Sequence, residues 1–267
     1  PQHLEVNVRA IRAGWEAVEP RYPHMIGDTS GDMLISGSRA MALGALAAGM
    51  NFYAAYPMSP ATPVLEALSE VAGEANIVVE QAEDEIAAIN MAIGASYAGA
   101  RAMTGTSGGG FSLMVEALGL SGMAEIPVVI ANVQRPGPVT GLPTRTEQSD
   151  LLFAISASQG EFPRMVIAPK NPEDMFYQTM RAFDLAERFQ IPVILLSDQY
   201  LGDASFTVPR FDPGRADISG PAQAHEAVID LTRKQSQRQA DDARTMGDHP
   251  LDRVMRLAGV GRAEHGR

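Results

Sequence analysis

Short, continuously apolar runs that alternate with helical patterns constrain the fold of this chain more than any other feature. Residues 77–79 read Ile-Val-Val, residues 128–131 read Val-Val-Ile-Ala, and residues 193–196 read Val-Ile-Leu-Leu. A strand that is apolar on both faces is buried on both faces, which is typical of a parallel sheet covered by helices. Parallel neighbours need crossover connections, and the helical patterns supply them. The predicted fold class is α/β: a doubly wound, mostly parallel sheet of about six or seven strands with helices on both faces.

The expected elements alternate along the middle of the chain. Strands are predicted at residues 33–36, 52–56, 76–80, 102–106, 127–132, 165–168 and 192–196. Helices are predicted at residues 38–48, 61–71, 83–98, 109–123 and 172–188. We assign this body to residues 31–208.

The two ends of the chain differ from the body. Residues 1–30 are predicted to form an N-terminal arm or linker, because one helical pattern is followed by Pro20, Pro23 and Gly27. Residues 209–267 are predicted to be a C-terminal extension, partly helical or mobile, with an exposed helix over 222–246 and a mobile tail after it.

Charge, hydropathy and cysteine content exclude several classes of function. The chain has 21 Lys and Arg against 32 Asp and Glu, a net charge of −11, which argues against nucleic acid or an anionic membrane as partner. No apolar run approaches the ~18–20 residues that cross a bilayer. No signal-peptide pattern opens the sequence, so we expect a cytoplasmic protein without a membrane role. Cysteine is absent, which excludes disulfides and a thiolate-held iron–sulfur cluster within this chain.

Ligands of open parallel sheets bind outside the carboxyl ends of the strands, so the loops that follow the strands hold the candidates. After the second strand, Ser59 lies between Pro57 and Pro60. The favoured interpretation is that Ser59 caps a helix beginning at Pro60, because capping is the common use of such a serine. A ligand contact is the alternative, and both uses are compatible.

Three consecutive acids, Glu83, Asp84 and Glu85, follow the third strand. Acids in a first helical turn complement the helix dipole, which is the purely structural interpretation. Glu85 differs from the other two because it shares a helix face with Ile89 and Ala92, whereas Glu83 and Asp84 can turn to solvent. A carboxyl group on an apolar face is desolvated, as in proton-relay carboxylates.

A glycine-rich loop, residues 104–110, follows the fourth strand and can bind an anion through backbone N–H groups. It matches neither the P-loop nor the dinucleotide-binding pattern, so ATP and NAD are disfavoured. All five histidines lie outside the body, which supports no metal site and no Ser-His-Asp triad.

Arg135 comes directly after the fifth strand, at the start of a long loop rich in proline and glycine. A guanidinium held at the end of a strand offers a bidentate clamp for a carboxylate or phosphate. An ordinary surface arginine is the equally weighted alternative.

Four motifs in this order resemble the α subunit of 2-oxoacid:ferredoxin oxidoreductases, in particular the 2-oxoglutarate type. The motifs are residues 56–60 (Tyr-Pro-Met-Ser-Pro), 80–88, 104–110 and 134–144, and the resemblance covers residues 33–205. In that family this domain has the thiamine diphosphate-binding fold and binds the aminopyrimidine half of the cofactor.

The resemblance implies roles for residues of the four loops. It makes Glu85, nine residues before Gly94, the catalytic glutamate that hydrogen-bonds the pyrimidine ring. The other residues that it places at the cofactor are Tyr56, Pro57, Ser107 and Gly108. Those that it places at the oxoacid are Ser59, Arg135 and Thr140.

The resemblance also implies cofactors and partners. A β subunit would hold the diphosphate, Mg²⁺ and an iron–sulfur cluster, in a heterodimer or higher assembly with this chain. The implied reaction decarboxylates 2-oxoglutarate or a related 2-oxoacid, passes electrons to ferredoxin and transfers the acyl group to coenzyme A.

Some positions depart from the family pattern. Residues 37–40 read Gly-Ser-Arg-Ala in place of Gly-Asn-Glu-Ala, Gly109 replaces a proline, and Val139 replaces a serine. Three alternatives therefore stay open: a non-catalytic assembly subunit with the same fold, a pyruvate-type member of the family, and a stand-alone flavodoxin-like nucleotide binder.

Overall fold

The computed structural model describes residues 2–17 and 31–216, and the chain divides into two compact units. One unit, Pro1–Gly31 with Lys234–Arg267, contains the helix α1 (Gln2–Glu16), where the sequence predicts a helical arm. The other unit, Asp32–Arg233, contains every other described element. The predicted helix over 222–246 and the tail after it lie outside the described residues, and the domain boundaries stay predictions.

Six parallel strands form the main sheet, in the spatial order β3-β2-β4-β5-β7-β6. The strands are β2 (Phe52–Ala55), β3 (Val78–Gln81), β4 (Ala102–Thr106), β5 (Val128–Gln134), β6 (Met165–Ile167) and β7 (Pro192–Asp198). Strands β5 and β7 are buried at every position, as their apolar runs predicted, and so is β4. The run at residues 77–79 predicted the same for β3, but this is wrong, because β3 is an edge strand and its Val78 is 55 % exposed.

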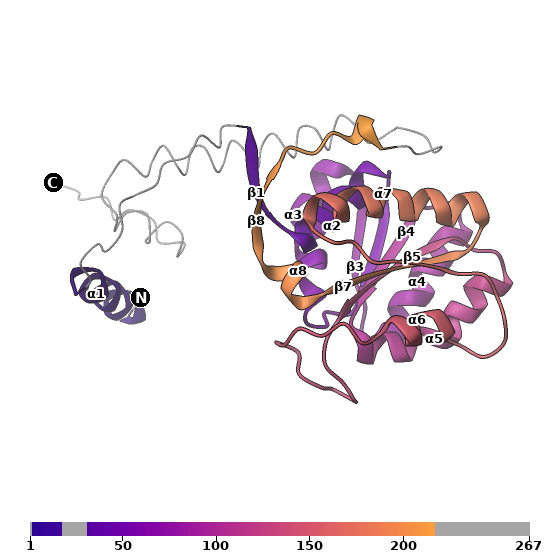
Figure 1. The fold of residues 1–267 in the computed structure, drawn as a ribbon, viewed down its shortest axis with the longest axis horizontal. Helices are drawn as coiled ribbons and strands as arrows, with labels where there is room; N and C mark the ends of the chain where they lie inside the picture. The colour runs from indigo at the N-terminus through magenta and orange to yellow at the C-terminus, as the bar shows by residue number, and fades with distance from the viewer. Residues whose placement is uncertain (1, 18–30, 217–267) are drawn as a thin grey trace. The chain divides into compact units, whose positions relative to one another are not determined.

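Helices cover both faces of this sheet, which confirms the predicted α/β, doubly wound class (Figure 1). One face carries α2 (Gly37–Ala47), α3 (Thr62–Ala75) and α7 (Pro172–Phe189). The other carries α4 (Glu85–Tyr97), α5 (Gly108–Met123) and α6 (Leu151–Ser156). Each face has its own buried apolar cluster. The small residues of α2 let it approach α7 closely, because a Cβ on Gly44 would overlap the carbonyl oxygen of Phe176.

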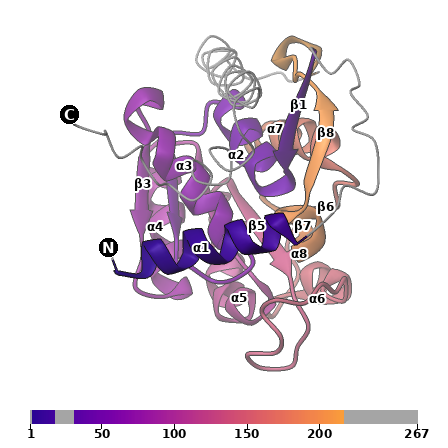
Figure 2. The same ribbon diagram turned by 90° about the vertical axis from the view of Figure 1, so that its left-hand side faces the viewer.

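The strand predicted at residues 33–36 is not part of the main sheet. It is β1 (Asp32–Ser36), which pairs antiparallel with β8 (Ser205–Pro209) in a separate two-stranded sheet (Figure 2). Burial alternates along β1, with Met33 and Ile35 buried and Leu34 half exposed. Alternation of this kind is typical of an antiparallel strand with one solvent face. Because residues 33–35 are all apolar, the sequence did not indicate that one face of this strand is exposed.

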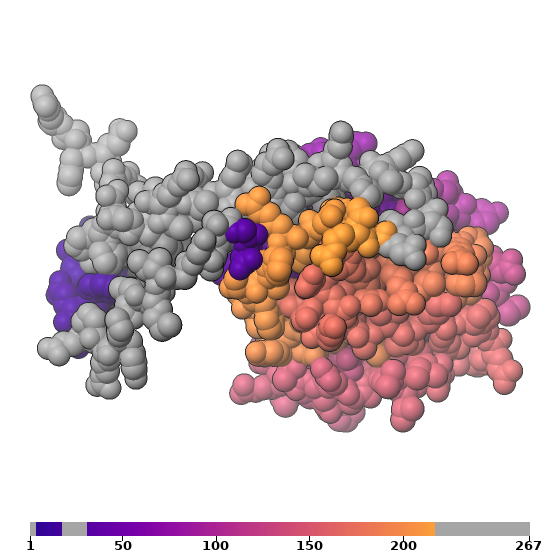
Figure 3. All heavy atoms as spheres, turned by 45° about the horizontal axis from the view of Figure 1, so that its top comes forward, coloured from indigo at the N-terminus to yellow at the C-terminus, as the bar shows by residue number. Residues whose placement is uncertain are grey.

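The chain after β8 continues along α7. Phe211 is buried and stacks on Phe176, with the ring centroids 4.5 Å apart, and the short 3₁₀ helix η1 (Pro213–Arg215) follows it. Figure 3 shows this segment, in orange, along the outer side of α7. Within the described residues, no helix has both the length and the apolar character that a bilayer crossing requires.

Two differences from the predicted elements affect the carboxyl edge of the sheet. Strands β5 and β7 extend two residues further than predicted, to Gln134 and Asp198, because their ladder continues through the pair Gln134↔Asp198. Two short helices were also not predicted: α6, which follows Asp150, and α8 (Gln199–Asp203), which follows β7 directly. Both differences bring polar side chains to the edge where the candidate loops meet.

Candidate functional site

The candidate loops meet at the carboxyl edge of the main sheet, where buried polar atoms lack hydrogen-bond partners. These atoms belong to residues on β4 and β5 or in the segments that follow β3, β4 and β5. They are Glu85 Oε1, Thr104 Oγ1, Ser107 Oγ, Asn132 Oδ1 and Arg135 Nε. The other such atoms of the described residues are Ser38 Oγ, Tyr53 Oη and Gln178 Oε1. Buried polar groups in proteins are normally paired, so a cluster of unpaired ones indicates a place where a ligand supplies the partners.

Glu85 is the first residue of α4, and its side chain is turned into the protein. Asp84 occupies the N-cap position and accepts a hydrogen bond from the Ala87 amide at 2.7 Å, so it satisfies the helix end. Glu85 is only 3 % exposed and shares its face with the fully buried Ile89 and Ala92. The prediction that Glu85 alone of the three acids lies on the apolar face is confirmed, because Asp84 and Glu83 are exposed.

The glycine-rich loop leads into α5, which begins at Gly108 with Ser107 at the N-cap position. Ser107 is fully buried, yet its hydroxyl makes no capping bond and has no other partner among the described residues. Gly108 lies against the carboxylate of Asp150, because a Cβ on it would come within 2.8 Å of Oδ2. The start of α5 is therefore packed on polar side chains of the sheet edge.

Arg135 is buried at 7 % exposure, so the interpretation as a surface arginine is wrong. Its Nη1 donates a hydrogen bond to the backbone carbonyl of Ser59 at 2.6 Å, which joins the loops after β5 and β2. Its Nε has no partner, and none of the ion pairs between described residues includes it. A buried guanidinium without a carboxylate partner favours an anionic ligand.

Ser59 does not cap a helix, which corrects the favoured sequence interpretation. Helix α3 begins at Thr62 with Ala61 at its N-cap position, and no side chain caps it. A turn closed by the Ala61 amide on the Met58 carbonyl, at 2.7 Å, precedes the helix and separates Ser59 from it. Ser59 is exposed, and its carbonyl accepts the hydrogen bond from Arg135.

The remaining predicted residues lie on the surrounding loops. Tyr56 is 38 % exposed and Pro57 is half-buried, directly after β2. Thr140 is exposed on the loop after β5. Its neighbour Val139 has a positive φ of 59° and presents its carbonyl to the glycine-rich loop, because a Cβ on Gly109 would come within 3.3 Å of that oxygen. The structure thus brings the loops after β4 and β5 together, but it places Thr140 at their exposed margin.

A buried network that sequence analysis missed anchors the far end of the Arg135 loop. Asn132 donates to Asp150 Oδ2 at 3.0 Å, and the Asp150 amide donates to Gln134 Oε1 at 2.9 Å. Gln134 also donates to the Ser197 carbonyl at 3.0 Å. The available signal was the pair of amides in an otherwise apolar strand, where the burial of Asn132 and Gln134 requires hydrogen-bond partners.

Beside this network is a cavity of about 450 Å³ at the ends of β5 and β7. Its lining includes Asp198, whose carboxylate accepts hydrogen bonds from Thr146 at 3.0 Å and Gln148 at 2.7 Å. The cavity lining also includes Lys170 and Tyr200. In the part of the chain that the structure describes, no group of three or more acidic or histidine side chains is arranged to hold a metal ion.

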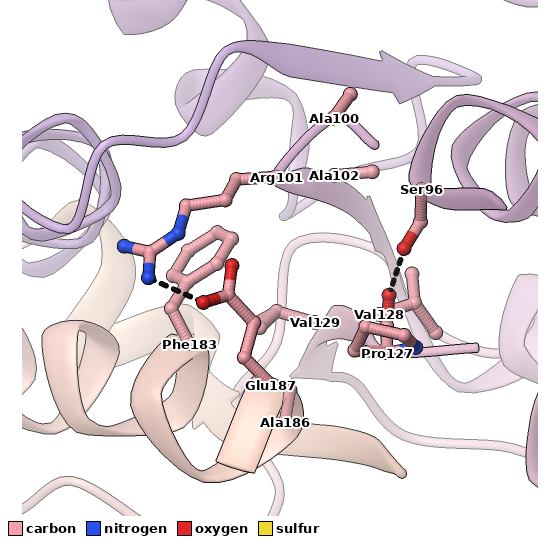
Figure 4. A pocket seen from close by; sticks show the side chains of 10 residues that line it. All are labelled: Ser96, Ala100, Arg101, Ala102, Pro127, Val128, Val129, Phe183, Ala186 and Glu187. Atoms are coloured by element: carbon pink, nitrogen blue, oxygen red, sulfur yellow. Dashed lines mark hydrogen bonds and ion pairs between the residues drawn. The ribbon is translucent and has the colours of Figure 1, made fainter. Parts of the chain in front are cut away.

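The amino edge of the same sheet also contains buried polar side chains, but these are paired (Figure 4). Arg101 donates to the Ala48 carbonyl and pairs with Glu187 of α7. Ser96 donates to the Pro127 carbonyl at 2.5 Å. The hollow that these residues line has a volume of only about 10 Å³. We interpret this edge as a structural contact between α4, α7 and the sheet.

Comparisons with known proteins agree on one family. Residues 43–248 match the family described as "Pyruvate flavodoxin/ferredoxin oxidoreductase, thiamine diP-bdg". The chain is 44% identical over 222 residues to 2-oxoacid:ferredoxin oxidoreductase 1, subunit alpha, of Aeropyrum pernix, covering 78% of this chain and 35% of that protein. It is 48% identical over 169 residues to 2-oxoglutarate synthase subunit KorA of Archaeoglobus fulgidus, covering 63% of this chain and 49% of that protein.

A solved structure of a 2-oxoacid oxidoreductase is also similar to this chain. The 2-oxoglutarate:ferredoxin oxidoreductase from Magnetococcus marinus, with 2-oxoglutarate, coenzyme A and succinyl-CoA bound, is similar with a TM-score of 0.71 and 39% sequence identity. The similarity covers 82% of this chain and 39% of that chain. The chain spans about a third of the length of the Aeropyrum relative and about half of the Archaeoglobus relative.

Proposed function

The chain belongs to the pyruvate flavodoxin/ferredoxin oxidoreductase, thiamine diphosphate-binding family, and we propose that it is the α subunit of a 2-oxoacid:ferredoxin oxidoreductase. The proposed reaction is the oxidative decarboxylation of 2-oxoglutarate or a related 2-oxoacid to acyl-CoA, with electrons passed to ferredoxin. The observation that carries this proposal is the buried carboxyl group of Glu85, whose Oε1 lacks a partner at the carboxyl edge of the sheet.

The residues at this edge fit the pyrimidine half of thiamine diphosphate. A buried, unpaired carboxyl oxygen suits a ring nitrogen that shares a proton with it, and Glu85 is the acid in that state. We assign Tyr56, Pro57, Ser107 and Gly108, on the loops after β2 and β4, to the surroundings of the ring. When bound, thiamine diphosphate supplies the carbon nucleophile and the electron sink for the decarboxylation.

Glu85 has a specific task in this arrangement: its carboxyl group holds or donates a proton at the ring nitrogen. Its burial against Ile89 and Ala92 keeps water from competing for that hydrogen bond. Asp84 caps α4, so the carboxyl group of Glu85 is not needed at the helix end. Because Asp84 already caps the helix, the buried Glu85 is available for a chemical role.

Arg135 is the proposed partner of the oxoacid carboxylate. Its guanidinium lies at the same edge, is buried, and carries a charge that no carboxylate of the described residues neutralises. A charge-assisted hydrogen bond to the substrate carboxylate would satisfy the unpaired Nε. We place Ser59, whose carbonyl already positions Arg135, and Thr140 beside the same carboxylate.

The proposed enzyme requires a partner for its other cofactors. Iron–sulfur clusters are held by cysteine thiolates, and this chain has no cysteine, so we assign the cluster, together with Mg²⁺, to a β subunit. We propose a heterodimer or higher α/β assembly in the cytoplasm that uses ferredoxin as electron acceptor and coenzyme A as acyl acceptor.

Co-expression with the β subunit, followed by assays with a panel of oxoacids and an artificial electron acceptor, tests the proposal. We expect acceptor reduction that depends on 2-oxoglutarate, coenzyme A and thiamine diphosphate. Preference for pyruvate would assign the chain to the pyruvate type. An assembled complex with no oxoacid-dependent turnover would overturn the catalytic role and indicate the non-catalytic assembly subunit. Tight nucleotide binding by the isolated chain would indicate the flavodoxin-like alternative.

A further inference from the structure

Gly110, in the first turn of α5, is packed against the side chain of Glu85. A Cβ at this position would come within 2.7 Å of both Cγ and Oε1 of Glu85. The same Cβ would overlap the hydroxyl oxygen of Thr106, the last residue of β4. The start of α4 and the end of β4 therefore both pack against the α-carbon of Gly110 at the start of α5.

The backbone conformation does not explain why glycine stands here. The positive φ angles of glycines are found at Gly49, Gly99, Gly141 and Gly160 among the described residues, and Gly110 is a helical residue. The reason for glycine is space, since any larger residue requires Glu85 or Thr106 to move. Gly73 of α3, by contrast, has no atom within 4 Å of its Cβ position, so alanine fits there without displacement.

Thr106 is fully buried, and its hydroxyl has only long contacts, to Met58 Sδ at 3.8 Å and to the Ser107 carbonyl at 3.4 Å. Both distances exceed those of a strong hydrogen bond from a hydroxyl. Thr106 also stands directly opposite Asn132 on the adjacent strand, whose Oδ1 is unpaired. The hydroxyl thus borders the Glu85 carboxyl group and is not committed to another acceptor.

We propose that Gly110 and Thr106 are positioning residues for Glu85. The bare α-carbon of Gly110 leaves the space that the Glu85 carboxyl group occupies, and the Thr106 hydroxyl borders that space on the strand side. Together they keep the carboxyl group at the sheet edge, with Oε1 left for a ligand. This inference rests on the proposed function, because it specifies how the fold presents Glu85 to thiamine diphosphate.

The first test compares three glycine-to-alanine variants in the co-expressed α/β complex. G110A places a methyl group against Glu85. G122A, in the same helix, places one within 2.7 Å of Cγ of the Phe162 ring, away from Glu85, and serves as the control for packing damage. G73A is the control without a clash. Each variant is measured for kcat, for the Kd of thiamine diphosphate by calorimetry, and for Tm.

We expect G110A to lower kcat by about 10²-fold and to weaken thiamine diphosphate binding, because displacement of a catalytic group by an ångström has effects of this size. G122A is expected to lower Tm while kcat, measured below its Tm, stays within about twofold of wild type. G73A should match wild type in all three measurements. A G110A variant with the kcat and Kd of G73A would overturn the inference.

Thr106 provides a second test if G110A fails to fold. T106V keeps the shape of the side chain and removes the hydroxyl, whereas T106S keeps the hydroxyl. We expect T106V to lower kcat with little change in the KM for the oxoacid, because Thr106 acts on Glu85 and not on Arg135, and T106S to restore most of kcat. Equal activity of T106V and wild type would remove Thr106 from the proposal.

Measurements on the wild-type complex test the proposed function, whereas measurements on its variants test the positioning role. A wild-type complex that neither binds thiamine diphosphate nor turns over an oxoacid would overturn the proposed function itself. A fully active wild-type complex whose G110A and T106V variants are equally active would overturn only the positioning role.

Discussion

Arg101 and Arg135 stand at opposite edges of the same sheet and are both largely buried, but their surroundings differ. At the amino edge, the guanidinium of Arg101 binds the Ala48 carbonyl and the Glu187 carboxylate (Figure 4). At the carboxyl edge, Arg135 binds one carbonyl, that of Ser59, and its Nε is unpaired. The same residue type thus completes a structural contact at one edge and keeps unused hydrogen-bonding capacity at the other.

Ser96 and Ser107 differ in the same way, one having a hydrogen-bond partner and the other none. Ser96 donates to the Pro127 carbonyl near the amino edge, whereas the fully buried Ser107 at the carboxyl edge has no partner for its hydroxyl. Unpaired buried groups reduce stability, and a bound ligand can compensate for a cluster of them. This contrast supports the proposal that the ligand binds at the carboxyl edge.

The largest effect is expected for E85Q at the carboxyl edge. Glutamine keeps the size of the side chain but cannot hold or donate a proton as a carboxyl group does, so kcat should fall by about 10²–10⁴-fold. Size-exclusion chromatography of the co-expressed complex checks that assembly is intact. Wild-type kcat in an assembled E85Q complex would break the assignment of Glu85 as the catalytic acid.

R135A is expected to raise the KM for the oxoacid by about 10–100-fold, since a hydrogen bond between charged groups contributes about 1.5–3 kcal/mol. Steady-state kinetics with the preferred oxoacid measure this change. R101A is the matched variant at the other edge, and its KM should equal that of wild type. Equal KM values for R135A and wild type would place Arg135 outside the substrate site.

R101A should in turn lower the free energy of unfolding by about 1–3 kcal/mol, because the Ala48 carbonyl and the partly exposed Glu187 lose their shared partner. Denaturant unfolding of both arginine variants measures the contrast. If R135A destabilised the protein as much as R101A does, the two edges would not differ in the way proposed.

Tyr53 provides an unpaired buried hydroxyl on the opposite face of the sheet from Glu85. It lies in the core on the α2 and α7 side against Gly105, and burial raises the pKa of its phenol well above the usual value. The unfolded phenol ionises above about pH 10 while the folded one stays neutral, so the unfolded state binds fewer protons and stability falls as the pH rises. Relative to Y53F, wild type should lose about 1.4 kcal/mol per pH unit above pH 10. If the free energies of unfolding of wild type and Y53F changed equally with pH, the raised pKa of Tyr53 would be wrong.

The smallest effect is expected for the serine pair. S96A removes a paired hydroxyl and should lower the free energy of unfolding by about 1 kcal/mol, whereas S107A removes an unpaired one and should leave stability equal or slightly higher. Thermal unfolding of both variants distinguishes the two outcomes. A loss of stability in S107A equal to that in S96A would mean that Ser107 has a partner in the protein.

Much of the carboxyl edge was predictable from local patterns. The apolar runs located β5 and β7, and the shared face of Glu85 and Ile89 placed the one buried acid of its cluster. Both inferences use spacing over a few residues, which the local backbone geometry determines. At two of the departures in residues 37–40, Ser38 is buried in α2 with its hydroxyl unpaired, and Arg39 pairs with Glu70 at 3.0 Å.

Other features were wrong or absent in the sequence analysis for a common reason. Ser59 as a cap, the 33–36 run as a sheet strand, and the surface interpretation of Arg135 each depended on a partner elsewhere in the chain. The packing of Gly110 on Glu85 had no local signal. The amides in β5 indicated that Asn132 needs a hydrogen-bond partner, but not that Asp150 is that partner.

The amino-acid sequence by itself determined the order of strands and helices and which loops lie at the carboxyl edge, because helix and strand periodicity is a property of neighbouring residues. Only the tertiary structure decided which sheet β1 joins and which buried atoms keep no partner. Those outcomes depend on strand register and helix packing, which bring together residues distant in the chain, such as Ser59 and Arg135.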